Sequence, residues 1–248
     1  MNPMGLACFG RLLLTTYGLV MVWSGVSAWG QANQAPAPAV TISEVVNQLV
    51  EHNQNRANRL RYYTSKRHYH LEYHGFPHSA DAAMDVEAVY SAPSKNFRVL
   101  SESGSPRLIN HVLKKLLKSE QDAATEQPRN ALTPENYNFA LLETAIEDGR
   151  RLFVLRVDPK IPSKFLFRGK IWVDAEDYAV VRVEAEPSEN LSFWIRNTEI
   201  RHLYSKVGEF WLPKQNTTVT KVRLGGIATL TIDYDKYEFQ VAQYVPPF

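Results

Sequence analysis

Cysteine is nearly absent from this sequence of 248 residues, which contains only Cys8, and its charge is almost balanced, with 28 lysines and arginines against 26 aspartates and glutamates. One cysteine excludes an intramolecular disulfide and a zinc site built on several thiolates. A net charge of +2 excludes a protein that binds nucleic acid by bulk electrostatics, because it leaves no excess of cations to neutralise phosphates. We therefore expect no disulfide framework and no nucleic-acid partner.

Several sequence motifs of enzymes are missing as well. The chain has no Gly-x-Ser-x-Gly or His-Glu-x-x-His motif, no phosphate-binding loop and no dinucleotide-binding fingerprint. We therefore assign no catalytic residue and expect no cofactor. What the chain does contain is 44% hydrophobic and 11% aromatic residues, which excludes wholesale disorder. Its length suits one all-β or α/β domain, or two small domains.

Residues 1–32 have the layout of a secretory signal peptide. Arg11 is followed by the apolar run Leu12–Val22 and then by small residues, as in exported proteins. The small residues favour cleavage after Gly30 or Ala32. The alternative is an inner-membrane anchor formed by residues 12–28, although the apolar run is short for a span of about 20 residues. We expect export to the periplasm as a soluble protein.

Two further features concern lipid modification and the start of the folded domain. Cys8 precedes the apolar run, so it is not the lipid-bearing cysteine of a lipoprotein, which follows such a run. Residues 33–40 are rich in proline and alanine and are expected to form a linker. We therefore expect one domain over residues 41–248, and we expect it to be a monomer.

Two amphipathic helices are expected in this domain. A capping box at Thr41 precedes apolar residues at helical spacing, which predicts a helix over residues 42–58. Ser105 and Pro106 are typical of a second helix start. Over Leu108–Lys118, rows of leucines lie opposite lysines. This basic helix is either a lid over a cavity or an ordinary helix packed on a sheet.

The remaining chain alternates apolar and polar residues with a period of two, which is typical of strands. Asp148-Gly149 predicts a tight hairpin. A second hairpin is expected around a three-residue loop, Ala175–Asp177, with Ile171 opposite Val181, because this register keeps apolar residues paired. Consecutive strands joined by short turns form an antiparallel meander. Further strands are expected at residues 84–90, 97–101, 191–204, 210–223 and 227–239.

Local patterns in the meander resemble a known superfamily. Residues 168–174 (RGKIWVD) place a Trp and an Asp before a turn, and residues 178–184 supply a Val-rich partner strand. Residues 210–213 (FWLP) open a strand after a Lys-Val-Gly turn. Together with the order of helices and strands, these patterns resemble the LolA/LolB/RseB-like periplasmic lipoprotein-carrier superfamily over residues 41–240.

The resemblance implies a mainly β (α+β) fold, a curved, incomplete antiparallel β-barrel with covering helices. It also implies an exported carrier that shelters acyl chains in a concave apolar cavity on their way to the outer membrane. The implied partners are a lipid or lipid-modified protein as cargo, an inner-membrane transporter and an outer-membrane receptor. An envelope sensor or regulatory module on the same fold is the alternative. Because the chain stops at Phe248 without a further domain, we favour the carrier.

The cavity of such a fold is lined by apolar side chains from the strands and from the basic helix. Alternation identifies the two faces of a sheet but does not tell which face is concave. The candidate lining and lid residues are Tyr69, Leu71, Tyr73, Phe97, Val99, Leu113, Leu116, Leu117, Phe139, Leu141, Phe167, Trp172, Trp194 and Trp211.

A group of histidines supports an enzyme as the remaining alternative. His68 and His70 point to the same side of a strand, about 7 Å apart, with His74 beyond them and Glu72 between. This spacing suits a Zn²⁺ site in which Glu72 acts as the base of a hydrolase. The ordinary explanation is a polar, solvent-facing side of the strand, and the neighbouring Arg67 favours it.

Overall fold

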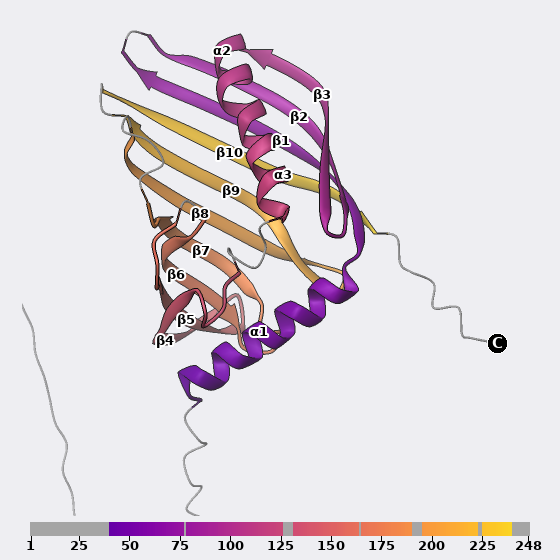
Figure 1. Ribbon diagram of the computed structural model, residues 1–248, viewed down its shortest axis with the longest axis vertical. Helices are drawn as coiled ribbons and strands as arrows, with labels where there is room; N and C mark the ends of the chain where they lie inside the picture. Colours follow the sequence, from indigo (N-terminus) through magenta and orange to yellow (C-terminus); the bar gives the residue numbers. More distant parts are fainter. Residues whose placement is uncertain are drawn as a thin grey trace, which may run out of the picture. The chain divides into compact units, whose positions relative to one another are not determined.

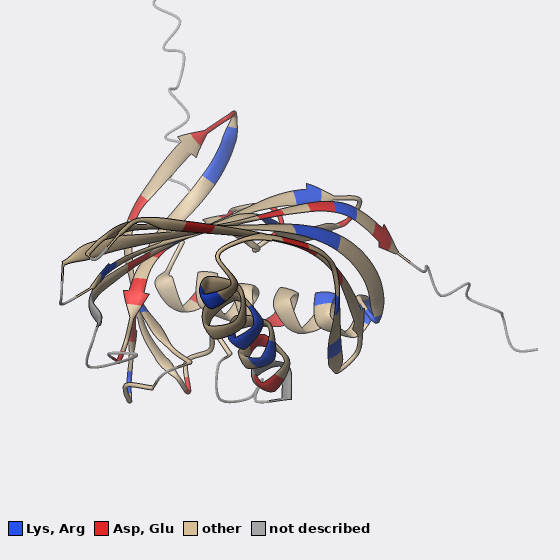
Figure 2. Cartoon of the chain, turned by 90° about the horizontal axis from the view of Figure 1, so that it is seen from above, with Lys and Arg blue, Asp and Glu red and all other residues tan. Residues whose placement is uncertain are grey.

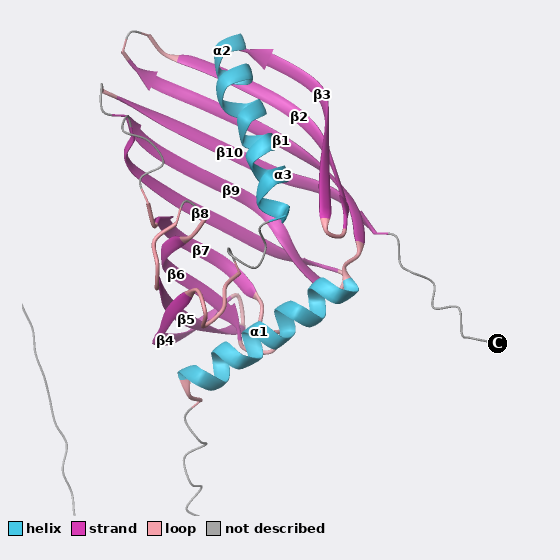
Figure 3. Ribbon diagram, viewed as in Figure 1, coloured by secondary structure: helices cyan, strands magenta, loops and turns pink. Residues whose placement is uncertain are grey.

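A computed structural model describes residues 40–76, 78–125, 131–163, 165–189, 195–222 and 225–239. They build two helical segments and ten strands (Figures 1 and 3). The strands are β1 (Tyr62–Gly75), β2 (Ala80–Ser91), β3 (Ser94–Gly104), β4 (Tyr137–Glu147), β5 (Arg150–Pro159), β6 (Phe167–Asp174), β7 (Val180–Pro187), β8 (Ile195–Val207), β9 (Phe210–Val222) and β10 (Gly226–Phe239).

All ten strands belong to one antiparallel sheet, in the order β3-β2-β1-β10-β9-β8-β7-β6-β5-β4. The first and last strands of the chain therefore lie side by side within the sheet, and β3 and β4 form its two edges. The sheet bends into an arch, and the helices lie on its concave side (Figure 2). The expectation of a curved, incomplete barrel with covering helices is confirmed.

The first helix, α1 (Ile42–Arg59), begins where its capping box predicts. The side chain of Thr41 accepts a hydrogen bond from the backbone N–H of Glu44 at 3.2 Å, which satisfies one of the free donors of the first turn. Val45 and Leu49, one turn apart, are completely buried against the sheet. The amphipathic pattern therefore sets both the start of α1 and the side it buries.

The second helical segment is continuous but contains a π-helical turn. Its parts are α2 (Pro106–Leu108), η1 (Ile109–Leu113) and α3 (Lys114–Thr125). In the π-helical turn the N–H of Lys114 bonds to the carbonyl of Ile109, five residues back. Ile109, Leu113 and Leu117 are buried against the sheet, while the lysines of α3 are exposed. The predicted basic helix is present, and it packs with its leucines on the sheet.

Three hydrophobic clusters hold these elements together. The α1 cluster consists of Val45, Val46, Leu49, Tyr137, Phe153, Leu155, Val157, Leu166, Ile171, Val173, Ala175 and Val183. The α3 cluster consists of Tyr69, Leu71, Ala82, Met84, Val86, Ile109, Leu113, Leu117 and Ile232. The outer cluster consists of Leu152, Val154 and Trp172. The first two fill the concave side under the helices, and the third lies on the opposite face of the sheet.

The first predicted hairpin is observed, and a bulge follows it. Asp148 and Gly149 adopt positive φ values of 49° and 76°, as a two-residue hairpin turn requires. At Leu142 the register between β4 and β5 shifts by one residue, so that Leu141 lies opposite Leu155. The bulge leaves Leu142 44% exposed and directs Leu141 to the α1 cluster.

The three-residue loop predicted for the second hairpin is wrong. β6 and β7 are joined by residues 175–179, and Ile171 lies opposite Val183 instead of Val181. The carboxylate of Asp174 accepts hydrogen bonds from two backbone N–H groups of the loop, at 3.0 and 2.8 Å. This local bonding organises a longer turn. The shift is by two residues, so apolar residues remain opposite each other.

The described residues all belong to one unit, Val40–Phe248. In this part of the chain no helix has the length and apolar character needed to cross a bilayer. Residues 1–32, expected to be a signal peptide, lie outside the described residues.

The buried position of α1 leads to a first prediction. Replacing Leu49, which is completely buried, by Ala should lower the free energy of unfolding by about 2–5 kcal/mol through lost burial and the cavity left behind. Leu142→Ala on edge strand β4 is the matched control and should change it by less than about 0.5 kcal/mol. Urea unfolding measures both. Equal effects of the two changes would show that α1 does not belong to the folded core.

Candidate functional site

The concave face of the sheet has apolar ends and a polar middle. Residues paired directly across neighbouring strands form a row that crosses the arch from β4 to β2. In order, they are Leu141, Leu155, Ile171, Val183, His202, Asn216, Ile232, Tyr69 and Met84. The first four lie in or against the α1 cluster and the last three lie in the α3 cluster. His202 and Asn216 therefore mark the strip of the concave face between the two clusters.

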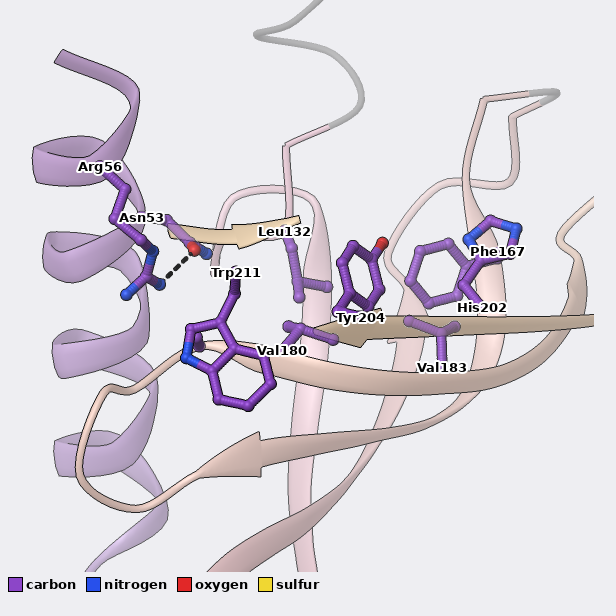
Figure 4. A pocket seen from close by; sticks show the side chains of 10 residues that line it. Asn53, Arg56, Leu132, Phe167, Val180, Val183, His202, Tyr204 and Trp211 are labelled. Carbon is purple, nitrogen blue, oxygen red and sulfur yellow. Dashed lines mark hydrogen bonds between the residues drawn. The ribbon is translucent and has the colours of Figure 1, made fainter. Parts of the chain in front are cut away.

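A cavity of about 260 Å³ lies beside this strip, between α1 and the sheet (Figure 4). Most of the side chains around it are apolar or aromatic. The lining residues are Asn53, Arg56, Leu132, Phe167, Ala179, Val180, Val183, His202, Tyr204 and Trp211. Arg56 and Asn53 lie at the end formed by α1, and His202 lies toward the other end, near Phe167 (Figure 4).

At the α1 end, the charged side chain of Arg56 is hydrogen-bonded to other residues of the protein. The guanidinium of Arg56 donates to the backbone carbonyls of Asp177 and Tyr178, both at 2.8 Å, and to Oδ1 of Asn53 at 2.7 Å. Burial lowers the pKa of Arg56, against the opposing attraction of Asp177. The indole N–H of Trp211 donates to Oδ2 of Asp177 at 2.8 Å. These bonds fasten α1 and β9 to the loop between β6 and β7.

At the β8 end of the cavity, two polar side chains make no hydrogen bond to any described residue. His202 and Tyr204 lie two positions apart on β8, so both side chains project to the concave face. Burial lowers the pKa of His202 to about 4, despite the opposing charge of Glu120, and burial raises the pKa of Tyr204. Both side chains are therefore uncharged at neutral pH. Across from His202, Asn216 has a buried Oδ1 without a hydrogen-bond partner.

A buried ion pair fastens α3 to the other side of the concave face. Arg67 on β1 is only 2% exposed, and its Nη1 lies 3.0 and 2.9 Å from the two carboxylate oxygens of Glu120. Lys95 adds a bond of 2.8 Å to the same carboxylate. The guanidinium lies over the rings of Phe97 and Tyr234. Burial alone lowers the pKa of Arg67, but the attraction of Glu120 outweighs it and raises the pKa.

The predicted lining residues are distributed over several places. Phe167 and Trp211 line the cavity. Those that instead fill the hydrophobic clusters, or pack against them, are Tyr69, Leu71, Leu113, Leu117, Phe97, Leu116, Phe139 and Leu141. Val99, on edge strand β3, is 37% exposed. The hydroxyl of Tyr73 donates to the carbonyls of Phe76 and Gly225 at one end of the sheet.

For Trp172 the prediction is wrong. It belongs to the outer cluster, on the face opposite the cavity, and the guanidinium of Arg182 lies 3.8 Å from its ring centre. β6 is buried on both faces, since Ile171 and Val173 belong to the α1 cluster. The alternation of its sequence sets Trp172 on the side of Arg168 and Lys170, opposite Ile171, but it does not tell which side is concave. Trp194 lies outside the described residues.

The search for apolar lining residues missed most of the cavity wall. The missed residues are Asn53, Arg56, Leu132, Ala179, Val180, Val183, His202 and Tyr204. An acyl cavity is expected to be apolar, so this expectation does not predict the polar lining residues. The sequence of β8 does contain a signal for two of them. His202 and Tyr204 lie on the same side of the strand as the apolar residue Ile200, which is consistent with a side that faces the interior.

The histidines considered for a metal site lie on the outer face of β1. Nδ1 of His68 is 2.6 Å from Oδ1 of Asp85, and Nε2 of His70 is 3.5 Å from Oε1 of Glu72. Among the described residues, no group of three or more His, Cys, Asp or Glu side chains is placed to hold a metal ion. These imidazoles therefore pair with carboxylates on an exposed strand face.

The chain is similar in part to one protein family and to several solved structures. A family model described as a family of unknown function (DUF5686) matches residues 128–236. No curated protein matches the sequence. A DUF1329 family protein from Desulfovibrio piger has a similar structure at 12% identity and a TM-score of 0.41. The match covers 82% of this chain and 95% of that one.

Two further solved structures carry the name of the expected superfamily or of its process. One is a domain described as an outer membrane lipoprotein-sorting protein from Vibrio parahaemolyticus, at 12% identity and a TM-score of 0.41, covering 79% of this chain and 94% of that one. The other is a LolA superfamily protein from Nitrosomonas europaea, at 11% identity and a TM-score of 0.36, covering 82% and 94%.

The ion pair under α3 leads to a second prediction. Glu120→Gln leaves the charge of Arg67 buried without its partner, so the free energy of unfolding should fall by about 3–5 kcal/mol. Glu102 forms a partly exposed salt bridge with Lys114, with Oε1 and Nζ 2.9 Å apart. Glu102→Gln removes this salt bridge and should lower the free energy of unfolding by only about 0–1 kcal/mol. Chemical denaturation of the two variants compares them directly. Similar small losses in both would show that Arg67 does not depend on Glu120.

The same pair predicts a pH dependence. Burial raises the pKa of Glu120, but Arg67 and Lys95 outweigh it, so the pKa lies below its ordinary value of 4.5. Stabilisation by a carboxylate with a lowered pKa is present above the ordinary pKa and is lost as the pH falls through the lowered one. The stability difference between the protein and Glu120→Gln should thus be constant near neutral pH and shrink in acid.

Proposed function

We propose that this protein is an exported, non-enzymatic binding protein that shelters the acyl chain of a lipid or of a lipid-modified protein. The observation that carries the proposal is the cavity between α1 and the sheet, which is walled mainly by apolar and aromatic side chains. It lies under α1, between the α1 cluster and the strip marked by His202 and Asn216. Each CH₂ group that enters such a space contributes about 0.8 kcal/mol of transfer free energy.

The size of the cavity sets how a ligand fits. Its volume of about 260 Å³ is slightly below the ~300–1,000 Å³ of ordinary ligand sites. A cavity of this size takes part of an acyl chain. A longer chain extends along the strip marked by His202 and Asn216, since neither hydrophobic cluster fills this strip. Displacing α3 opens that direction, and the bonds of Arg56 keep α1 in place.

The exposed side of α3 suits a protein that meets membranes. Lys114, Lys115 and Lys118 are exposed there, and lysines on such a helix are attracted to anionic lipid surfaces. We place the protein in the periplasm, between an inner-membrane transporter that delivers the cargo and an outer-membrane receptor that accepts it. The sequence resemblance and the leader-like residues 1–32 support this placement.

Filling the cavity is the test of this function. Val180 lines the cavity and its neighbour Val181 packs on the outer cluster, so the two valines are a matched pair on β7. Val180→Phe should weaken the binding of diphenylhexatriene, a neutral fluorescent hydrocarbon, by about tenfold or more, equivalent to about 1.4 kcal/mol. Val181→Phe should leave it unchanged. Fluorescence titration of the purified proteins measures both.

Two results would overturn the proposal. One is that the unmodified protein binds neither diphenylhexatriene nor a competing acyl ester. The other is that Val180→Phe and Val181→Phe affect binding equally while both proteins keep their unfolding midpoints. In either case the cavity is a packing defect and not a ligand site.

A further inference from the structure

We propose that the β8 end of the cavity recognises an uncharged polar group attached to the acyl chain, an ester, amide or hydroxyl, and discriminates against a free carboxylate. The groups that bind it are the imidazole of His202 and the hydroxyl of Tyr204. This inference rests on the proposed function, because it concerns the same cavity, and it adds the chemical class of ligand that the cavity selects.

The first argument is that these side chains have hydrogen-bonding capacity to spare. Both line the cavity, and both rise from the same side of β8 (Figure 4). Both side chains are partly exposed, and neither makes a hydrogen bond to a described residue, so their polar atoms can bond to a ligand in the cavity. A neutral imidazole offers one donor and one acceptor, and a tyrosine hydroxyl offers both. Together they can serve the carbonyl of an ester or amide, or a hydroxyl.

A third polar group extends this arrangement. Asn216 lies directly across from His202, and such cross-strand pairs have Cβ atoms about 4.5–5.5 Å apart. The side-chain NH₂ of Asn216 donates a hydrogen bond to the hydroxyl of Tyr234, at 2.8 Å. Its Oδ1 is buried and has no hydrogen-bond partner among the described residues. This acceptor suits a ligand hydroxyl or N–H group. The polar strip is therefore incomplete in the protein alone, as expected for a place where a ligand supplies the missing bonds.

The second argument is the charge of the site. His202 is uncharged at neutral pH, since burial holds its pKa at about 4, and the charge that reaches it is the negative one of Glu120. Among the described lining residues the cation is Arg56, which is at the α1 end and already bonded to Asn53 and two carbonyls. A carboxylate at the β8 end would lose its hydration without gaining a counter-charge, which is costly. An ester carries no such penalty.

The experiment compares three ligands of one chain length. Methyl laurate, laurate and dodecane compete with diphenylhexatriene for the purified protein at about pH 8, where laurate is ionised. Methyl laurate should bind about tenfold more tightly than laurate. Tyr204→Phe and His202→Leu should each weaken methyl laurate by about fivefold to tenfold, as expected for the loss of one hydrogen bond to a neutral group. Neither change should weaken dodecane.

His70→Leu is the matched control, because His70 lies half-exposed on the outer face of β1, and it should leave all three ligands unaffected. If laurate binds as tightly as methyl laurate, or if Tyr204→Phe and His202→Leu leave methyl laurate unchanged, the inference is overturned while acyl binding stands. If dodecane and the probe do not bind the unmodified protein, the proposed function itself fails. Tyr204→Phe keeps the ring in place, so it remains informative if His202→Leu does not fold.

Discussion

A strongly curved sheet has an inner face that must be covered, and the other features of this protein follow from how that cover is built. Ten antiparallel strands form the arch, and two helical segments of limited length lie inside it. The buried side chains of α1 and α3 fill the two ends of the concave face. The middle strands β8 and β9 receive less apolar cover and carry polar side chains instead. The cavity and its polar strip lie where the cover is thinnest.

The two helices are attached by different kinds of bond. α1 is held at its C-terminal half by Arg56, which bonds to neutral carbonyls of the loop after β6. α3 is held by Glu120, whose carboxylate forms ion pairs with Arg67 and Lys95. A bond to carbonyls does not respond to moderate acid, whereas the bond of a carboxylate weakens as it is protonated. The attachment of α3 therefore weakens in acid, below the ordinary pKa of a carboxylate, whereas the attachment of α1 does not depend on the protonation of Glu120.

Much of the fold was accessible from the sequence, because the relevant signals are local. The capping box at Thr41 and the alternation of the strands predicted α1 and the antiparallel meander. The failures came where a single side chain changed the backbone. The carboxylate of Asp174 lengthens one turn, and the bulge at Leu142 shifts a register. Neither effect follows from a hydrophobic pattern.

The candidate site was harder to predict, for two physical reasons. The alternation of β6 sets Trp172 and Ile171 on opposite faces, but only the curvature of the sheet shows that the face of Trp172 is the outer one. The expectation of an apolar cavity also directed attention to leucines and aromatics, most of which are packed tightly in the clusters. Phe167 and Trp211 line the cavity, and so do the polar residues His202 and Tyr204, which become recognisable only when the curvature of the sheet is known.

The path of the chain gives the arch one more property. The sheet ends in β3 and β4, which are consecutive strands of the chain and lie at opposite edges. The segment that joins them includes α3 and therefore leads from one edge of the sheet to the other. The two edges of the sheet are therefore joined by the covalent chain as well as by the contacts that α3 makes with the sheet.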